Sequence, residues 1–201
     1  NRVTLDGFFA GPHGEIDWFI HDPEIDAAVH GTGSEPAATI FGRLTYEMFV
    51  AYWPKVRENP DADPAERQIA EELHQMHKIV FSTTLPALDW ENSELKRGDV
   101  AEEVRRLKES PGPDIIIFGS GTIVQQLTDA GLIDEYQLIL TPVVLGEGKL
   151  LFDGVQRRSM ELLDTRTFES GHVLLRYVSG EAAAGGQQAR QEAERAPAGA
   201  G

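Results

Sequence analysis

The sequence predicts an α/β fold whose mixed sheet is parallel in its first part and antiparallel at its C-terminal edge. Two observations lead to this prediction. Through residues 1–130, apolar strand-like runs alternate with segments whose apolar residues recur at helical spacing. Through residues 135–178, the apolar segments are mostly strand-like, with few helical patterns between them.

Residues 114–123 are the most informative stretch. Large apolar residues follow one another there without alternation, which is typical of a strand buried on both faces. The run ends at Gly119-Ser120-Gly121, and apolar residues at helical spacing follow. A glycine turn between a strand and a helix points backbone N–H groups at an anion. A tight turn without a ligand explains this stretch equally well when it is taken alone.

The same pattern occurs earlier in the chain. Residues 37–41 predict a buried strand, Gly42-Arg43-Leu44-Thr45 a turn, and the apolar residues after it a helix that should end at Pro54. Arg43 could grip a phosphate, and Thr45 and Thr122 add hydroxyl groups. We therefore expect the two turns to lie on either side of one diphosphate. The alternative is a solvated Arg43 between two ordinary turns.

The other elements follow from capping residues and periodicity. Asp22 followed by Pro23 predicts the start of a helix that ends near residues 31–33. The remaining expected elements are a strand at 2–5, a helix at 65–76, a strand at 78–82, a short edge strand within 89–96, a helix at 100–107, a long apolar strand within 136–145, and a hairpin at 160–178 that turns at 169–171.

Composition narrows the possible functions. The 201 residues fit one ordinary domain or two small ones, and a net charge of -15 argues against nucleic acid or anionic membranes as partners. No apolar stretch approaches the roughly 18 residues of a membrane helix. The chain has no cysteine, which fits a reducing compartment, and we expect a cytoplasmic protein. We expect one domain at residues 1–179 and a disordered, low-complexity tail at 180–201.

Acidic residues near the start of the chain are candidates for acid–base chemistry. Asp26 lies within the first predicted helix, beside an apolar face. A carboxylate in that position could hydrogen-bond the amino groups of a heterocycle. A solvated acid favoured by the helix dipole is the simpler interpretation. The six histidines show no ligand spacing, so no metal site is expected.

Hydroxyl groups follow a third strand at Ser82-Thr83-Thr84. They could bind a further phosphate or a ribose, although a simple turn explains them as well. Two common nucleotide-binding motifs are disfavoured. The Gly119 turn lacks the third glycine of the dinucleotide fingerprint because residue 124 is valine, and no Walker lysine follows it.

Several motifs together resemble the dihydrofolate-reductase-like superfamily. Within it, they are most similar to the branch that contains the reductase domain of the riboflavin-pathway deaminase-reductase. The motifs are Thr4-Leu5-Asp6-Gly7, residues 41–47 with Trp53-Pro54, residues 118–121, residues 131–136 and residues 142–148. The resemblance covers residues 1–178. It implies a three-layer fold with a central mixed sheet, NADPH as cofactor, and hydride transfer to a heterocyclic or sugar-linked substrate.

The resemblance also implies roles for individual residues. By position, the pyrophosphate and 2′-phosphate would meet Gly42, Arg43 and Thr45, the adenosine would meet Ser82 and Thr83, and the other face of the diphosphate would meet Gly119, Ser120, Gly121, Thr122 and Ile123. Asp6, Trp18 and Asp26 would bind the substrate, with Asp6 and Asp26 as the catalytic candidates.

Two function classes follow. The first is an NADPH-dependent oxidoreductase in which Asp26 orients the substrate or assists its protonation. The second is a nucleotide-binding module or dimeric scaffold of the same fold without turnover. The helix at residues 22–30 has no arginine, whereas the riboflavin-pathway reductases hold a ribose phosphate with basic residues. The identity of the substrate therefore stays open. The apolar strand within 136–145 favours a homodimer.

Overall fold

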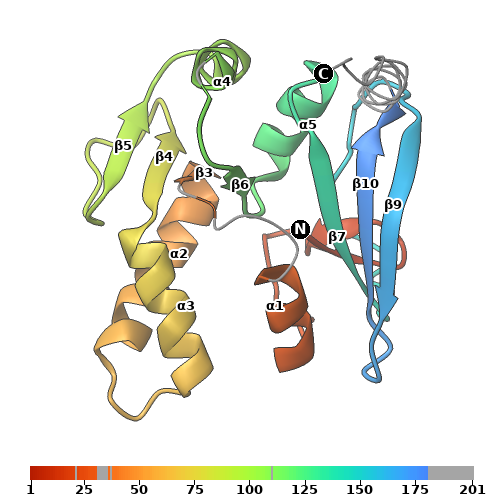
Figure 1. Ribbon diagram of the computed structural model, residues 1–201, viewed down its shortest axis with the longest axis horizontal. Helices are drawn as coiled ribbons and strands as arrows, with labels where there is room; N and C mark the ends of the chain where they lie inside the picture. Colours follow the sequence, from red (N-terminus) through yellow and green to blue (C-terminus); the bar gives the residue numbers. More distant parts are fainter. Residues whose placement is uncertain (21, 31–35, 37, 110, 181–201) are drawn as a thin grey trace, which may run out of the picture.

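The computed structural model describes residues 1–20, 22–30, 36, 38–109 and 111–180. The predicted helix end near residues 31–33, position 37 of the predicted strand, and the predicted tail from residue 181 lie outside the described residues. The elements, shown in Figure 1, are β1 (Arg2–Thr4), β2 (Phe8–Ala10), α1 (Pro23–His30), β3 (Ala38–Gly42), α2 (Arg43–Glu58), α3 (Pro64–Gln75), β4 (His77–Phe81), β5 (Ser93–Lys96), α4 (Val100–Lys108), β6 (Ile115–Ile117), α5 (Gly121–Asp129), β7 (Glu135–Thr141), β8 (Lys149–Leu150), β9 (Met160–Thr167) and β10 (Val173–Ser179).

The structure confirms the predicted α/β fold class. A four-stranded sheet of order β5-β4-β3-β6 is parallel throughout, and it forms the left half of the molecule in Figure 1. A second four-stranded sheet of order β1-β7-β10-β9 forms the right half. In that sheet β1 runs parallel to β7, and the β9–β10 hairpin is antiparallel. The antiparallel C-terminal edge is therefore where the sequence predicted it.

Side-chain packing joins the two sheets. No backbone ladder links them within the described residues: β6 is the edge strand of one sheet and β1 is an edge strand of the other. A hydrophobic cluster lies where they meet. Val3 of β1 and Val124 of α5 are buried in it, Leu151 is fully buried, and Ile117 of β6 packs against them.

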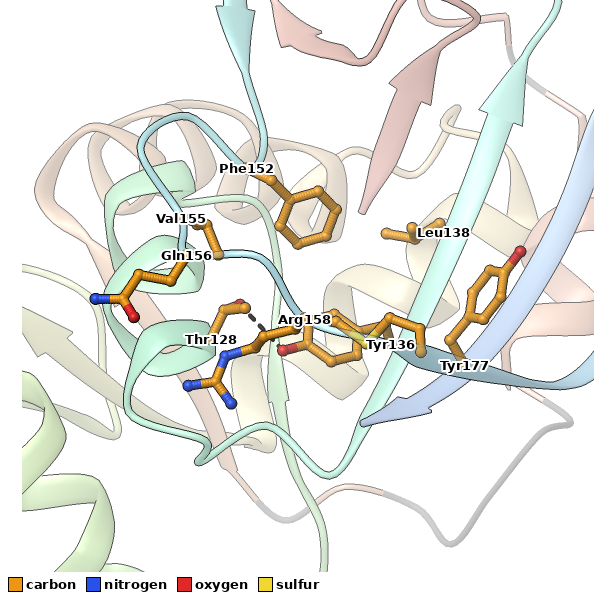
Figure 2. A pocket seen from close by; sticks show the side chains of 9 residues that line it. Thr128, Tyr136, Leu138, Phe152, Val155, Gln156, Arg158 and Tyr177 are labelled. Atoms are coloured by element: carbon orange, nitrogen blue, oxygen red, sulfur yellow. Dashed lines mark hydrogen bonds between the residues drawn. The ribbon is translucent and has the colours of Figure 1, made fainter. Parts of the chain in front are cut away.

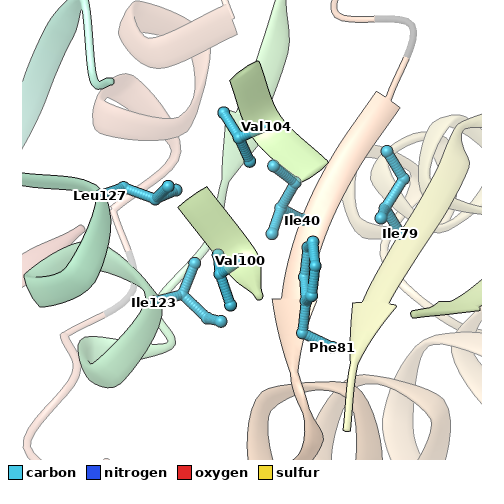
Figure 3. Packing of buried hydrophobic residues seen from close by; sticks show 7 residues of the cluster. All are labelled: Ile40, Ile79, Phe81, Val100, Val104, Ile123 and Leu127. Carbon is cyan, nitrogen blue, oxygen red and sulfur yellow. The ribbon is translucent and has the colours of Figure 1, made fainter. Parts of the chain in front are cut away.

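Helices cover both faces of the parallel sheet. Neighbouring residues of a strand point to opposite faces, so they pack against different helices. Ile40 and Ile79 pack with residues of α4 and α5 in the cluster of Figure 3. The next residues along, Phe41 and Val80, pack with residues of α2 and α3 on the other face. The predicted burial is therefore confirmed for β3, and β4 is buried on both faces as well. The predicted burial of residues 115–117 on both faces was wrong. The residues of β6 are only half-buried, because that strand lies at the edge of its sheet.

The predicted end of a helix at Pro54 was wrong. Helix α2 continues through Pro54 to Glu58. Proline has no N–H group, so one helical hydrogen bond is lost, but the turn beyond it has compensating contacts. Val56 is buried, and Arg57 forms an ion pair with Glu71 of α3 at 2.6 Å.

The predicted strand within residues 136–145 also ends earlier than expected. Strand β7 stops at Thr141, and Pro142 follows it. The chain then turns, with the Val143 N–H donating to the Thr141 carbonyl at 2.7 Å. The Val143 carbonyl accepts from the Leu5 N–H at 2.9 Å. The apolar residues after Thr141 therefore form a loop against the end of β1 instead of a longer strand.

A buried lysine closes the C-terminal end of α3. Lys78, in β4, is fully buried, and its ammonium group donates to the carbonyls of Leu73 and Met76 at 2.7 Å and of His74 at 3.0 Å. The ring of Trp90 lies 4.7 Å from Nζ. These carbonyls belong to the last turn of the helix and the residue after it, where acceptors lack helical partners. Burial lowers the pKa of Lys78 from 10.5 to about 8.

The first prediction concerns stability and its pH dependence. Lys78→Met should reduce the free energy of unfolding by about 2 kcal/mol at pH 7, because buried carbonyls lose their donor. Since the pKa of Lys78 is lower in the folded chain, folding releases a proton between pH 8 and 10.5, and wild-type stability gains over that interval. The gap between wild type and variant should widen there, as measured by urea unfolding.

Lys55→Met, at an exposed lysine of α2, is the matched control and should show no comparable change. A gap between wild type and Lys78→Met that stays constant from neutral to alkaline pH would contradict the lowered pKa of Lys78.

Candidate functional site

The two predicted turns lie side by side. Strands β3 and β6 are parallel neighbours, so their carboxyl ends meet at one edge of the sheet. Between the turns, the Gly42 N–H donates to Oγ of Ser120 at 2.8 Å. The Ser120 hydroxyl donates in turn to Oγ1 of Thr45, also at 2.8 Å. The predicted juxtaposition of the Gly42 and Gly119 turns is thus confirmed.

The helices that leave these turns have open N-termini. Neither α2 nor α5 has a side-chain hydrogen bond at its N-cap. In contrast, Asp63 caps α3 and Asp99 caps α4, each with its carboxylate. Uncapped N–H groups at a helix N-terminus carry partial positive charge and favour an anion. The two open N-termini, from adjacent strand ends, form the candidate anion site.

The turn before α5 has an unusual backbone. Gly119 has a φ of 59°, and Ser120 is left-handed as well, with φ 58° and ψ 61°. Gly121 is required for a different reason, which is close packing. A Cβ atom there would lie 2.5 Å from the ring of Phe9, from strand β2. This contact could not be predicted from the sequence, because Phe9 and Gly121 lie far apart in the chain.

Arg43 and Thr122 are the exposed members of the predicted set. The Arg43 side chain is 42% exposed, and its guanidinium forms an ion pair with Glu47 at 2.9 Å. The spacing of four residues would have allowed this pair to be predicted from the sequence. Arg43 therefore has to exchange Glu47 for a phosphate if it is to bind one. Thr122 is exposed at the start of α5, whereas Ile123 is buried in the core.

The hydroxyl groups after β4 stabilise their own turn. Oγ of Ser82 accepts from the N–H groups of Thr84 at 3.1 Å and of Leu85 at 3.0 Å. Thr83 is exposed. Arg97, a residue not singled out from the sequence, donates to the Leu85 carbonyl at 2.7 Å. Thr84 is exposed as well, so the turn lies beside the candidate anion site with two exposed threonines and a nearby guanidinium.

Asp6 holds two loops together. One carboxylate oxygen accepts from the Thr4 hydroxyl at 2.6 Å, and the other accepts from the Gly146 N–H at 2.8 Å. The Leu145 N–H donates as well, at 3.3 Å. The hydrogen bond from Thr4, and then those from the backbone, lower the pKa of Asp6 below its usual value. Asp6 is thus an ionised acceptor that fixes the loop after β7, and its catalytic role stays a prediction.

Asp26 and Trp18 lie on the other half of the molecule. Helix α1 packs through Ile25 on β7 and β10, and Asp26 of that helix forms an ion pair with Arg2 of β1 at 3.0 Å. Trp18 is buried, and its indole N–H has no hydrogen-bond partner within the described residues. A buried donor without a partner is suited to an acceptor on a ligand.

Two pockets lie on the surface of the described residues. One, of about 300 Å³, adjoins the start of α5 and is lined by Phe9, Thr122, Gln125, Gly148, Lys149, Leu150 and Asp153. The other, of about 280 Å³, is shown in Figure 2 between β7, β10 and the loop after Phe152. Tyr136 and Tyr177 contribute rings to it, and the Tyr136 hydroxyl donates to Thr128. None of the predicted site residues lines this second pocket.

The described part of the chain contains no group of three or more side chains that could hold a metal ion. No helix there is long and apolar enough to cross a membrane.

Comparison with known proteins identifies the family. The model of the RibD C-terminal domain matches residues 1–174. The chain belongs to the RibD C-terminal domain family. Among curated relatives, protein YyaP of Bacillus subtilis is 39% identical over 177 residues, with 87% of this chain and 90% of YyaP covered. Protein YwjB of the same organism is 27% identical, with 88% and 93% covered. Both carry the description "uncharacterized".

Solved structures share the fold of this chain. A putative riboflavin biosynthesis protein from Shewanella matches with a TM-score of 0.65 and 19% identity, over 89% of this chain and 95% of that one. Dihydrofolate reductase from Enterococcus faecalis, complexed with NADP(H), matches at 0.58 and 16%, over 89% and 93%. The Thermotoga maritima deaminase/reductase matches at 0.59 and 16%, over 89% of this chain and 54% of the longer enzyme. The RibD C-terminal domain fold is therefore dihydrofolate-reductase-like, as the resemblance implied.

The second prediction tests the packing of Phe9 on the α5 turn. Gly121→Ala places a methyl group into the ring of Phe9 and should lower the free energy of unfolding by about 2 kcal/mol. Adding Phe9→Leu should recover part of that loss, because the smaller side chain makes room. Thermal and urea unfolding measure both effects.

Gly98→Ala is the matched control for this substitution. A Cβ atom at Gly98 meets its nearest neighbour, in the Glu103 side chain, at an ordinary 3.7 Å, so stability should change little. Equal stabilities for Gly121→Ala and Gly98→Ala would contradict the close packing of Phe9.

Proposed function

We propose that this chain is an NADPH-dependent reductase that binds the cofactor's diphosphate between the N-termini of α2 and α5. The observation that supports the proposal is the pair of uncapped helix N-termini, bridged by Ser120, at the carboxyl ends of adjacent parallel strands. Adjacent strand ends of an α/β sheet are where such folds bind dinucleotides. Membership of the RibD C-terminal domain family supports it as well.

The donors fit a diphosphate. Backbone N–H groups at both helix starts, the Thr122 hydroxyl and the Arg43 guanidinium all lie at this edge of the sheet. A net charge of -15 does not oppose binding, because a small anion responds chiefly to its local donors. Ser82, Thr83 and Arg97, at the ends of β4 and β5, would meet the adenosine.

The substrate side is formed by the other half of the molecule. NADPH, when bound, supplies a hydride to the substrate. Asp26, on α1, would orient a heterocycle by accepting hydrogen bonds from its N–H groups, and Arg2 fixes the position of that carboxylate. Trp18 would donate its indole N–H to a substrate acceptor. Asp6 would keep the loop at Leu145 and Gly146 in place.

A second function is supported by two ion pairs at the candidate site. Arg43 is paired with Glu47, and Asp26 is paired with Arg2. If Asp26 stays paired with Arg2 and does not act on a substrate, the fold would bind a nucleotide without turnover. Such a module would bind NADPH and would not oxidise it with any dihydropteridine or pyrimidine. Stopped-flow absorbance with a panel of these heterocycles distinguishes it from the reductase.

The third prediction concerns cofactor choice. Arg43→Ala should raise the Kd of NADPH by about tenfold and that of NADH much less, since only NADPH carries a 2′-phosphate for the guanidinium. Glu47→Gln should leave NADPH binding equal or tighter, because it removes the competing carboxylate. Nicotinamide fluorescence titration gives both constants.

Arg106→Ala is the matched control, because Arg106 is an exposed helical arginine that also has an ion pair on its own helix, with Glu103. It should leave both constants unchanged. Equal weakening of NADPH and NADH by Arg43→Ala would remove Arg43 from the 2′-phosphate site. No binding of NADPH by the wild type at near-millimolar concentration would exclude the proposed function.

The fourth prediction concerns assembly. We propose a homodimer. The strand expected within residues 136–145 offers no open edge, because β7 lies between β1 and β10 in its sheet. Strand β9 is an edge strand, and every residue after Met160 in it is exposed, including Leu162 at 49% and Leu163 at 48%. Light scattering after size exclusion should give twice the chain mass, and Leu162→Glu should reduce it. A wild-type monomer at micromolar concentration would contradict the proposal.

A further inference from the structure

Ser120 occupies a backbone conformation that disfavours serine. Its left-handed φ of 58° and ψ of 61° are less favourable for a residue with a side chain than for glycine. The side chain is nevertheless buried, and its hydroxyl forms hydrogen bonds with both Gly42 and Thr45. These two bonds offset the cost and explain why a side chain is useful at this position.

The hydrogen bonds of the bridge run from Gly42 through Ser120 to Thr45. The Gly42 N–H can only donate, so Oγ of Ser120 accepts from it at 2.8 Å. The single hydrogen of the Ser120 hydroxyl goes to Oγ1 of Thr45, which accepts it at 2.8 Å. Thr45 keeps its own hydrogen, and no acceptor for that hydrogen lies within hydrogen-bond distance in the described part of the chain.

The hydrogen bond between Gly42 and Ser120 stands where the next backbone hydrogen bond between β3 and β6 would otherwise form. The backbone pairing of β3 with β6 ends at Ile40 and Ile117. Two residues further along β3, the Gly42 N–H is satisfied by the side chain of Ser120 instead of a backbone carbonyl. The chain after β6 can therefore turn into α5 while remaining attached to the start of α2.

We infer that Ser120 is a positioning residue that acts through Thr45, holding the Thr45 hydroxyl as a hydrogen-bond donor to an anion between α2 and α5. The inference rests on the proposed function, because the anion is the diphosphate of NADPH. It changes the role that the family resemblance implied for Ser120. The hydrogen of Ser120 is committed to Thr45, so Thr45 makes the contact with the ligand and Ser120 sets its orientation.

A double-mutant cycle tests this coupling. Ser120→Gly removes the hydroxyl together with the backbone strain, and Thr45→Val removes the donor without changing the shape of the side chain. Each should raise the Kd of NADPH, and that of inorganic pyrophosphate, by about fivefold to tenfold. Ser120→Gly added to Thr45→Val should cause no further loss, because Thr45 transmits the effect. Thr45→Ser, which keeps the hydroxyl, should bind NADPH within about twofold of wild type.

Thr128→Val is the matched control. It removes another buried hydroxyl contact of α5, the bond from Tyr136 at the opposite end of the helix, and should lower thermal stability without changing either Kd. If Ser120→Gly is poorly folded, Ser120→Ala gives the same comparison. Wild-type affinity in a Ser120 variant, or multiplied losses in the double variant, would overturn the inference alone. A wild type that binds neither NADPH nor pyrophosphate would overturn the proposed function and the inference together.

Discussion

The hydroxyl of Ser120 is the contact on which the candidate site depends. It is bonded to Gly42, 78 residues earlier in the chain, and to Thr45, 75 residues earlier. Without it, the carboxyl ends of β3 and β6 would be linked only by the short ladder that ends at Ile40 and Ile117. A buried hydrogen bond between two turns fixes their separation more narrowly than apolar packing does, because it has a preferred distance and direction.

Much of the fold was predictable because its signals are local. Unbroken apolar runs identified β3 and β4, and glycine turns identified the ends that face the site. The adjacency of the two turns followed from parallel order. The continuation of α2 through Pro54 could not be predicted, because the compensating contact comes from Glu71 of another helix. Local propensity predicts a helix end there, and tertiary packing overrides it.

The candidate site shows the same division between local and long-range information. Arg43 and Thr45 were identifiable as polar groups after a strand, and Glu47 was within reach of the same reasoning. The role of Asp6 was not, because its partners Leu145 and Gly146 lie 139 and 140 residues away. The hydrogen bond from Thr4, and then those from this distant loop, lower the pKa of Asp6. The long-range bonds make Asp6 an anchor for the loop, which residue type alone does not reveal.

The boundary between the two sheets has a mechanical consequence. The turns at Gly42 and Ser120 belong to one sheet, whereas α1 with Asp26 packs on the other. Across that boundary lie apolar side chains such as Val3 and Leu151, whose attraction has no preferred direction. A small tilt of one sheet against the other would leave the ladders of both described sheets intact, yet it would alter the distance between the Gly42 and Ser120 turns and Asp26. The spacing between the two halves is therefore set by the shapes of the packed side chains and not by a continuous backbone ladder.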